Sequence, residues 1–179
     1  MERRLAMLVV VVVFAVGAAG VAGAQGTSTG SAGRDVLRGT SGPDRLAGGF
    51  GSDRLIGVGG ADVLLGESGD DRLDGGMDDD ELDGGTGNDR LDADHGSDAL
   101  DGGDGDDVLR GGPGNDFIVE SGFGNDRLLD GGQGDDYVDS NRGNDRLVMG
   151  GEGNDVLLGG SGSDRLEGGD GDDWMDGGQ

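Results

Sequence analysis

An aspartate recurs almost every nine residues along most of this chain, and this spacing constrains the fold more than any other feature. A fixed period predicts a stack of similar structural units, because each unit repeats one local geometry and packs on its neighbour. The aspartates that share this phase are Asp35, Asp44, Asp53, Asp62, Asp71, Asp80, Asp89, Asp98, Asp107, Asp116, Asp126, Asp136, Asp145, Asp155, Asp164 and Asp173.

Aligned on its aspartate, the repeat unit reads G-G-x-G-x-D-x-L-x. Glycines allow the positive φ angles of a tight turn. The three positions after the aspartate are expected to point outward, inward and outward, as in a short strand. The inward eighth position is Leu in thirteen copies, and Ile118, Val138 or Met175 in the others. Each unit is therefore predicted to form one turn and one strand.

Two units make a coil of eighteen residues with a strand on each side. Coils stacked at the spacing of neighbouring strands form two parallel sheets around a thin aliphatic core. The sequence therefore predicts an all-β fold: a parallel β-roll, that is, a right-handed β-solenoid, of about eight two-strand coils over residues 30–179.

The unit resembles the RTX (hemolysin-type) calcium-binding nonapeptide repeat over residues 30–178. The resemblance implies a β-roll that holds multiple Ca²⁺ ions between neighbouring turns on the same side. It implies that the sixteen aspartates and the turn carbonyls ligate the metal. It also implies pairing between units i and i+2, for example Asp89 with Asp107.

The available ligands suit calcium. The chain has no cysteine and one histidine, His95, so zinc, copper and haem sites lack their usual ligands. Ca²⁺ accepts six to eight oxygen ligands in flexible geometry, whereas Mg²⁺ requires a strict octahedron. Extracellular calcium modules bind with dissociation constants of roughly 10⁻⁴ to 10⁻³ M, and we expect that range here.

The copies are uneven. Arg34 beside Asp35, and Asp78 in place of a glycine, are expected to weaken their sites, whereas the run of complete motifs over residues 150–173 is expected to bind best. The nine-residue spacing becomes ten at three places. The residues predicted to be inserted there, as bulges between strand and turn, are Glu120, Asp130 and Met149.

The first 24 residues differ in kind. Arg3 and Arg4 precede an apolar run over residues 5–16, and Ala22, Gly23 and Ala24 form a cleavage motif. This pattern predicts a signal peptide over residues 1–24 and a secreted, extracellular protein. An uncleaved membrane anchor is the alternative. Residues 25–29 are interpreted as a short polar lead-in.

The formal net charge is −25. Without metal such a glycine-rich chain is expected to be largely disordered. The charge also disfavours nucleic acid and, after signal cleavage, membranes as partners. An enzyme is not expected, because no serine has a histidine at a recognisable spacing and His95 occupies a variable position.

Sorting the outward seventh position by side of the roll predicts two different faces. One would carry an arginine stripe: Val36, Arg54, Arg72, Arg90, Val108, Arg127, Arg146 and Arg165. The other would carry an apolar stripe: Arg45, Val63, Glu81, Ala99, Phe117, Tyr137, Val156 and Trp174. Strand propensity alone explains such residues. The alternative is a docking face for a protein, a glycan or a second copy, formed by Phe117, Tyr137, Val156 and Trp174.

The favoured function is a secreted calcium-binding module, folded by Ca²⁺, with a structural, adhesion or interaction role. One alternative is a calcium buffer or sensor without a specific partner. Another is an accessory module of a secreted hydrolase or toxin.

Overall fold

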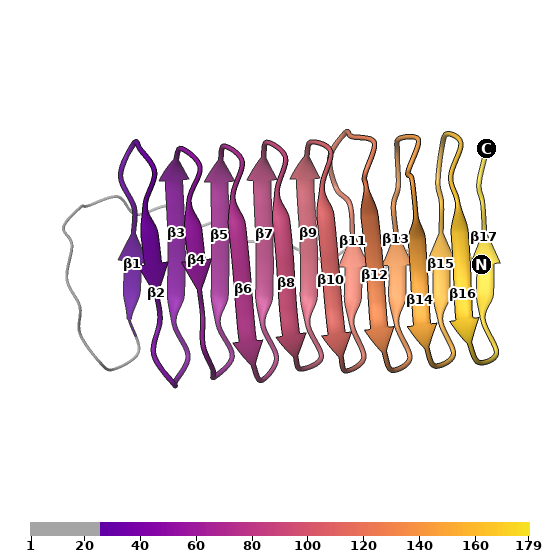
Figure 1. Ribbon diagram of the computed structural model, residues 1–179, viewed down its shortest axis with the longest axis horizontal. Coiled ribbons are helices and arrows are strands. Elements are labelled where there is room, and N and C mark those ends of the chain that lie inside the picture. Colours follow the sequence, from indigo (N-terminus) through magenta and orange to yellow (C-terminus); the bar gives the residue numbers. More distant parts are fainter. Residues whose placement is uncertain (1–25) are drawn as a thin grey trace, which may run out of the picture.

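The computed structural model describes residues 26–179, so the predicted signal peptide lies outside the described part. Residues 26–179 form seventeen strands without a helix, and therefore without a helix that could cross a membrane. The strands belong to two sheets in which every pairing is parallel and joins strands two apart in the chain (Figure 1). This arrangement confirms the predicted all-β solenoid of about eight coils.

The nine-stranded sheet contains the odd-numbered strands. These are β1 (Thr27–Thr29), β3 (Arg45–Phe50), β5 (Val63–Ser68), β7 (Glu81–Thr86), β9 (Ala99–Asp104), β11 (Phe117–Val119), β13 (Tyr137–Asp139), β15 (Val156–Leu158) and β17 (Trp174–Asp176). The eight-stranded sheet contains β2 (Val36–Arg38), β4 (Arg54–Ile56), β6 (Arg72–Met77), β8 (Arg90–His95), β10 (Val108–Pro113), β12 (Leu128–Gln133), β14 (Val148–Glu152) and β16 (Leu166–Asp170).

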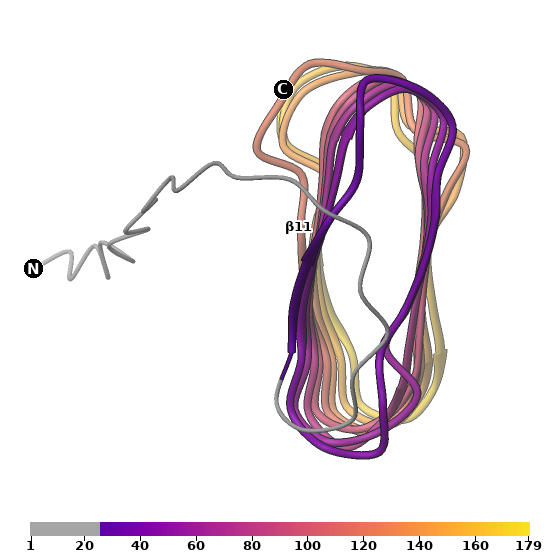
Figure 2. The same ribbon diagram turned by 90° about the vertical axis from the view of Figure 1, so that its left-hand side faces the viewer.

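Aliphatic side chains fill the space between the two sheets. Figure 2 looks along the stack and shows the backbone coils as flattened rings. Inward and outward residues alternate because successive side chains of a strand point to opposite faces. The buried members are Leu46, Leu55, Leu64, Leu73, Leu82, Leu91, Ala93, Leu100, Leu109, Ile118, Leu129, Val138, Val148 and Leu157. The core thus consists of one row of inward aliphatic side chains from each sheet, and the two rows face each other.

The nine-stranded sheet begins inside the segment interpreted from the sequence as a polar lead-in. Strand β1 pairs with β3, with Thr27 opposite Arg45 and Thr29 opposite Ala47. The amide of Gly26 also donates to Asp44 Oδ1 at 2.8 Å, as the aspartate amides do further along the stack. Residues 26–29 therefore add a partial coil to the roll.

The structure corrects two of the three predicted insertions. Asp130 lies opposite Arg110 and Met149 lies opposite Asp130, so both are regular strand residues. The extra residue is instead taken up at the start of β12, where Arg127 keeps the amide bond to Asp107 O but Leu128 is the partner of Val108.

The same slip occurs at the start of β14. Its consequence is that Leu129 and Val148 enter the core in place of Leu128 and Leu147. A bulge at the strand start leaves the following strand-to-turn junction in register, with Gly132 opposite Gly112. The third extra residue lies where it was predicted, at the junction between β11 and the following turn. However, the amide of Glu120 donates to Asp139 O as a first glycine does, so Ser121 and not Glu120 is the additional residue.

Candidate metal centre

The sixteen aspartates form two columns, one along each edge of the roll. The first column follows the odd-numbered strands, at the upper edge in Figure 1, and contains Asp35, Asp53, Asp71, Asp89, Asp107, Asp126, Asp145 and Asp164. The second column lies at the opposite edge and contains Asp44, Asp62, Asp80, Asp98, Asp116, Asp136, Asp155 and Asp173. Turns two units apart are therefore neighbours, as the resemblance to the RTX repeat implied.

One oxygen of each aspartate links consecutive coils. The amide of Asp89 donates to Asp107 Oδ1 at 2.6 Å, and the amide of Asp80 donates to Asp98 Oδ1 at 2.7 Å. The same bond recurs along both columns, up to Asp145 with Asp164 and Asp155 with Asp173. Oδ1 is thus used by the fold itself and fixes the orientation of the carboxylate.

The other oxygen is buried and has no hydrogen-bond partner in twelve of the sixteen aspartates: Asp53, Asp62, Asp71, Asp80, Asp89, Asp98, Asp107, Asp116, Asp136, Asp145, Asp155 and Asp164. Buried polar atoms in native proteins are almost always satisfied, so a recurrent unpaired carboxylate oxygen indicates a missing positive partner. A cation beside Oδ2 would be such a partner.

A turn carbonyl of the next coil lies beside eight of these twelve oxygens. A Cβ built on Gly48 would lie 2.7 Å from Asp53 Oδ2 and 2.8 Å from Gly66 O, the carbonyl of the next coil. The first glycine of the motif therefore keeps open a space lined by carboxylate and carbonyl oxygens, the donor set that Ca²⁺ prefers. The residues present fit the metal that the repeat implies.

The second and fourth glycines have a different role. Gly49 and Gly51 have φ angles of +101° and +124°. A Cβ on Gly51 would also lie 2.7 Å from the carbonyl carbon of Gly33 in the preceding coil. Both the backbone conformation and the close stacking of turns therefore require glycine here.

The first two aspartates are engaged differently. Oδ2 of Asp35 accepts hydrogen bonds from the amide and hydroxyl of Ser31, and Oδ2 of Asp44 accepts them from the amide and hydroxyl of Thr40. The Ser31 bonds lower the pKa of Asp35 below its usual value. These two oxygens are already satisfied by hydrogen bonds, and weaker metal sites near the N-terminal end stay a prediction.

Burial raises the carboxyl pKa through the middle of both columns. Burial raises the pKa to about 7 for Asp80, Asp89, Asp126 and Asp136, and neighbouring carboxylates add to this increase. The backbone hydrogen bond that each carboxylate accepts from the preceding coil lowers the pKa and opposes it. Buried carboxylates in register need protons or cations as counterions. At neutral pH the aspartate columns can therefore release protons and bind cations in their place.

A second ladder, at the fifth position of the motif, was missed by the sequence reasoning. The amide of Asp106 donates to Asn88 Oδ1 at 3.0 Å, and the amide of Asn125 donates to Asp106 Oδ1 at 3.0 Å. Asn, Asp or Ser occupies this position in every copy from Asp70 onward. This preference for Asn, Asp and Ser can be read from the sequence, but the invariant aspartate at the next position makes it easy to overlook.

Glu120 is the other residue that sequence reasoning undervalued. Its carboxylate comes together with those of Asp107 and Asp126, and one oxygen of each lies within 4.8 Å of the others. All three residues are buried. The sequence signal for this cluster was an acidic residue in the ten-residue interval between Asp116 and Asp126.

Fold and site together define a metal-binding parallel β-roll. The model of the RTX calcium-binding nonapeptide repeat family matches residues 29–64, 56–91, 83–118, 92–128, 118–147 and 149–179. The chain belongs to this family, and its repeats bind Ca²⁺. Such a roll is a structural calcium-binding domain and is not typically catalytic. No curated protein matches the chain significantly.

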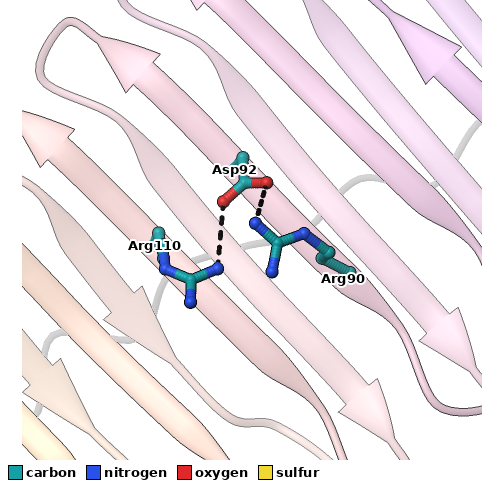
Figure 3. Close-up of polar contacts among 3 residues, drawn as sticks. All are labelled: Arg90, Asp92 and Arg110. Carbon is teal, nitrogen blue, oxygen red and sulfur yellow. Dashed lines mark hydrogen bonds and ion pairs between the residues drawn. The ribbon is translucent and has the colours of Figure 1, made fainter.

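The outward faces of the two sheets differ, largely as predicted. On the eight-stranded sheet Arg54, Arg72 and Arg90 stand side by side. Asp92 bridges Arg90 and Arg110, with the Arg110 contact at 3.4 Å (Figure 3). The predicted stripe is wrong beyond Val108, because the slips place Leu128 next in the row and leave Arg127 and Arg146 outside the strands.

On the nine-stranded sheet the apolar row is continuous. Phe117 lies opposite Tyr137, Tyr137 opposite Val156, and Val156 opposite Trp174. The rings of Phe117 and Tyr137 stack with their centroids 4.9 Å apart. Phe117 and Trp174 are 44% and 55% exposed, so this row is accessible.

Proposed function

We propose that the sixteen aspartates, together with turn carbonyls, ligate Ca²⁺ between successive coils, and that this binding folds the chain into a structural module. The observation that carries the proposal is the row of buried carboxylate oxygens without a partner beside turn carbonyls. Each ion would join two coils and neutralise charge in a chain of net charge −25. Metal binding then supplies folding free energy directly.

Circular dichroism during a calcium titration tests this function. We expect coil in chelator and β-structure at millimolar Ca²⁺, with Mg²⁺ ineffective because it rarely gives up its waters for carbonyl ligands. Replacing Asp89 by Asn should remove one bound ion, whereas replacing the exposed Asp104 by Asn should not. A β-spectrum that is indifferent to chelator would contradict metal-coupled folding.

The chain is further proposed to act outside the cell, where calcium is plentiful. Support comes from the apolar run and cleavage motif in residues 1–24 and from the absence of cysteine, since bound metal would replace the disulfides common in secreted domains. Secretion into the medium of an expressing cell, with loss of the first 24 residues by mass spectrometry, is the test. Retention of those residues would favour the membrane-anchor alternative.

An adhesion or interaction role is proposed for the row formed by Phe117, Tyr137, Val156 and Trp174. Support comes from its continuity and from the exposure of its largest ring. The partner classes are a protein, a glycan or a second copy of the chain. A pure calcium buffer or sensor would need only the columns and no specific face.

Replacing both Tyr137 and Trp174 by serine separates these roles. Self-association is measured by sedimentation and ligand binding by glycan arrays, both at saturating Ca²⁺. An interaction module loses self-association or ligand binding while its calcium content is unchanged. Serine at Val108, on the opposite sheet, is the matched control. If the double variant sediments and binds as the wild type does, the row has no interaction role, and the calcium buffer or sensor is the favoured function.

A further inference from the structure

The coil slip at Glu120 creates a site unlike any other in the first column. At Gly84, an added Cβ would meet Asp89 Oδ2 and Gly102 O, each at 2.6 Å. At Gly102, one coil further on, it would meet Asp107 Oδ2 at 2.7 Å and the two carboxylate oxygens of Glu120 at 2.5 and 2.7 Å. A carboxylate thus stands where the preceding rungs have a turn carbonyl.

Glu120 is buried and aimed into this space. Its exposed fraction is 2%, and neither carboxylate oxygen has a hydrogen-bond partner. Together with Asp107 and Asp126 it forms a cluster in which one oxygen of each residue lies within 4.8 Å of the others. Three buried carboxylates without a counter-charge repel one another strongly, so the arrangement calls for a cation.

The backbone holds Glu120 in this position. Its amide donates to Asp139 O at 2.9 Å, the bond that the first glycine makes in regular units such as Gly39 with Ile56 O. Its carbonyl accepts a hydrogen bond from Asn141 Nδ2 at 2.9 Å. Glu120 therefore takes the place of the first glycine in the ladder, and its side chain enters the site from a fixed backbone position.

We propose that Asp107, Glu120 and Asp126 form one calcium site of higher affinity than the regular rungs, which loads first and from which the rest of the roll orders. This proposal rests on the proposed calcium-dependent function. Ligand charge and rigidity tune calcium sites over several orders of magnitude. A third carboxylate on a preorganised backbone therefore predicts a first binding step at least about tenfold tighter than the others.

Titration of the full chain with Ca²⁺ against a chromophoric chelator tests the proposal. The wild type should bind one ion more tightly than the rest. Two variants should lose that step while keeping the weaker ones: Glu120→Gln, which removes the charge at constant size, and deletion of Glu120, which restores the nine-residue spacing. Glu152→Gln, an exposed change of equal charge, should keep the tight step.

The outcomes separate this site from the function on which it rests. A wild type with a single affinity class overturns the proposal while leaving calcium-coupled folding in place. An unchanged or tighter first step in Glu120→Gln also overturns it. Absence of calcium binding in the wild type overturns both the site and the proposed function.

Discussion

At the scale of single residues, backbone strain in residues 26–179 is confined to the glycine positions of the repeat motif. The five non-glycine residues with positive φ in residues 26–179 all occupy the second or fourth position of a degenerate motif: Val58, Glu67, Asp78, Asp94 and Asn141. Asn and Asp tolerate this conformation, but a β-branched side chain does not. Val58, at φ +96°, is therefore the most strained residue of the set.

Replacing Val58 by Gly should stabilise the folded roll. Relief of the strained φ, of order 1–3 kcal/mol, outweighs the extra entropy that glycine gives the unfolded chain, so the net gain should be about 1 kcal/mol. Thermal denaturation at saturating Ca²⁺ measures it. Val63→Gly, in the regular strand β5, should instead destabilise, and equal effects of the two changes would contradict the strain argument.

Protons and calcium should compete for the columns. Burial raises the pKa of Asp80 from 3.8 to about 7, so between these values the cation-free fold binds more protons than the unfolded chain. Its stability is therefore highest at low pH and is lost as the pH rises toward 7. Calcium needs the ionised form, so its affinity changes in the opposite direction.

The expected result is that, in chelator, β-structure grows when the pH falls from 7.5 to 5.5, while the calcium midpoint rises over the same range. Circular dichroism at fixed ionic strength follows both. Asp35, whose pKa is lowered by Ser31, should not contribute to this change. A calcium midpoint that is constant from pH 5.5 to 7.5 would show that the raised pKa values do not govern binding.

At the scale of strands and turns, the sequence predicted the number of elements better than their register. The ten-residue spacing between Asp126 and Asp136 indicates one extra residue but does not show which residue it is. Leu128 and Leu129 are both suitable for the core, so only the packing decides which enters. The strand-start bulge at Arg127 selects Leu129, and the outward row changes from arginine to leucine with it.

Truncation of the two leucines tests this register. Leu129→Ala should cost about 2–5 kcal/mol, since Leu129 is fully buried and its truncation leaves a cavity in the core. Leu128→Ala, at a half-buried outward position, should cost less than about 1 kcal/mol. Denaturant unfolding at fixed Ca²⁺ gives both values, and the reverse order would restore the register expected from the sequence.

At the scale of the whole molecule, the period alone predicted the architecture, because every contact that defines it lies between neighbouring coils. The same period could not reveal where coils differ. The fifth-position ladder is absent at Arg34, Pro43 and Ala61, whose side chains cannot replace its acceptors. The core is also thinner at both ends, where Leu37 and Leu166 are only partly buried and Met175 is 50% exposed.

Hydrogen exchange should therefore be graded along the stack. In a repeat protein stability is a sum of local terms, so the ends open without the middle. At saturating Ca²⁺, amides of β2 and β17 should exchange at least about tenfold faster than those of β8 and β10, a difference of about 1.4 kcal/mol. Uniform protection would mean that the roll unfolds as one unit.

The hydrogen bonds of the aspartate columns have a single direction. Each carboxylate accepts from the coil before it, while the fifth-position side chain accepts from the coil after it, across only 18 to 20 residues. Every completed coil therefore presents a fixed donor and a fixed acceptor to the segment that follows. A chain that is synthesised from its N-terminal end can add coils one by one onto this template, so folding can advance before the last residues are present.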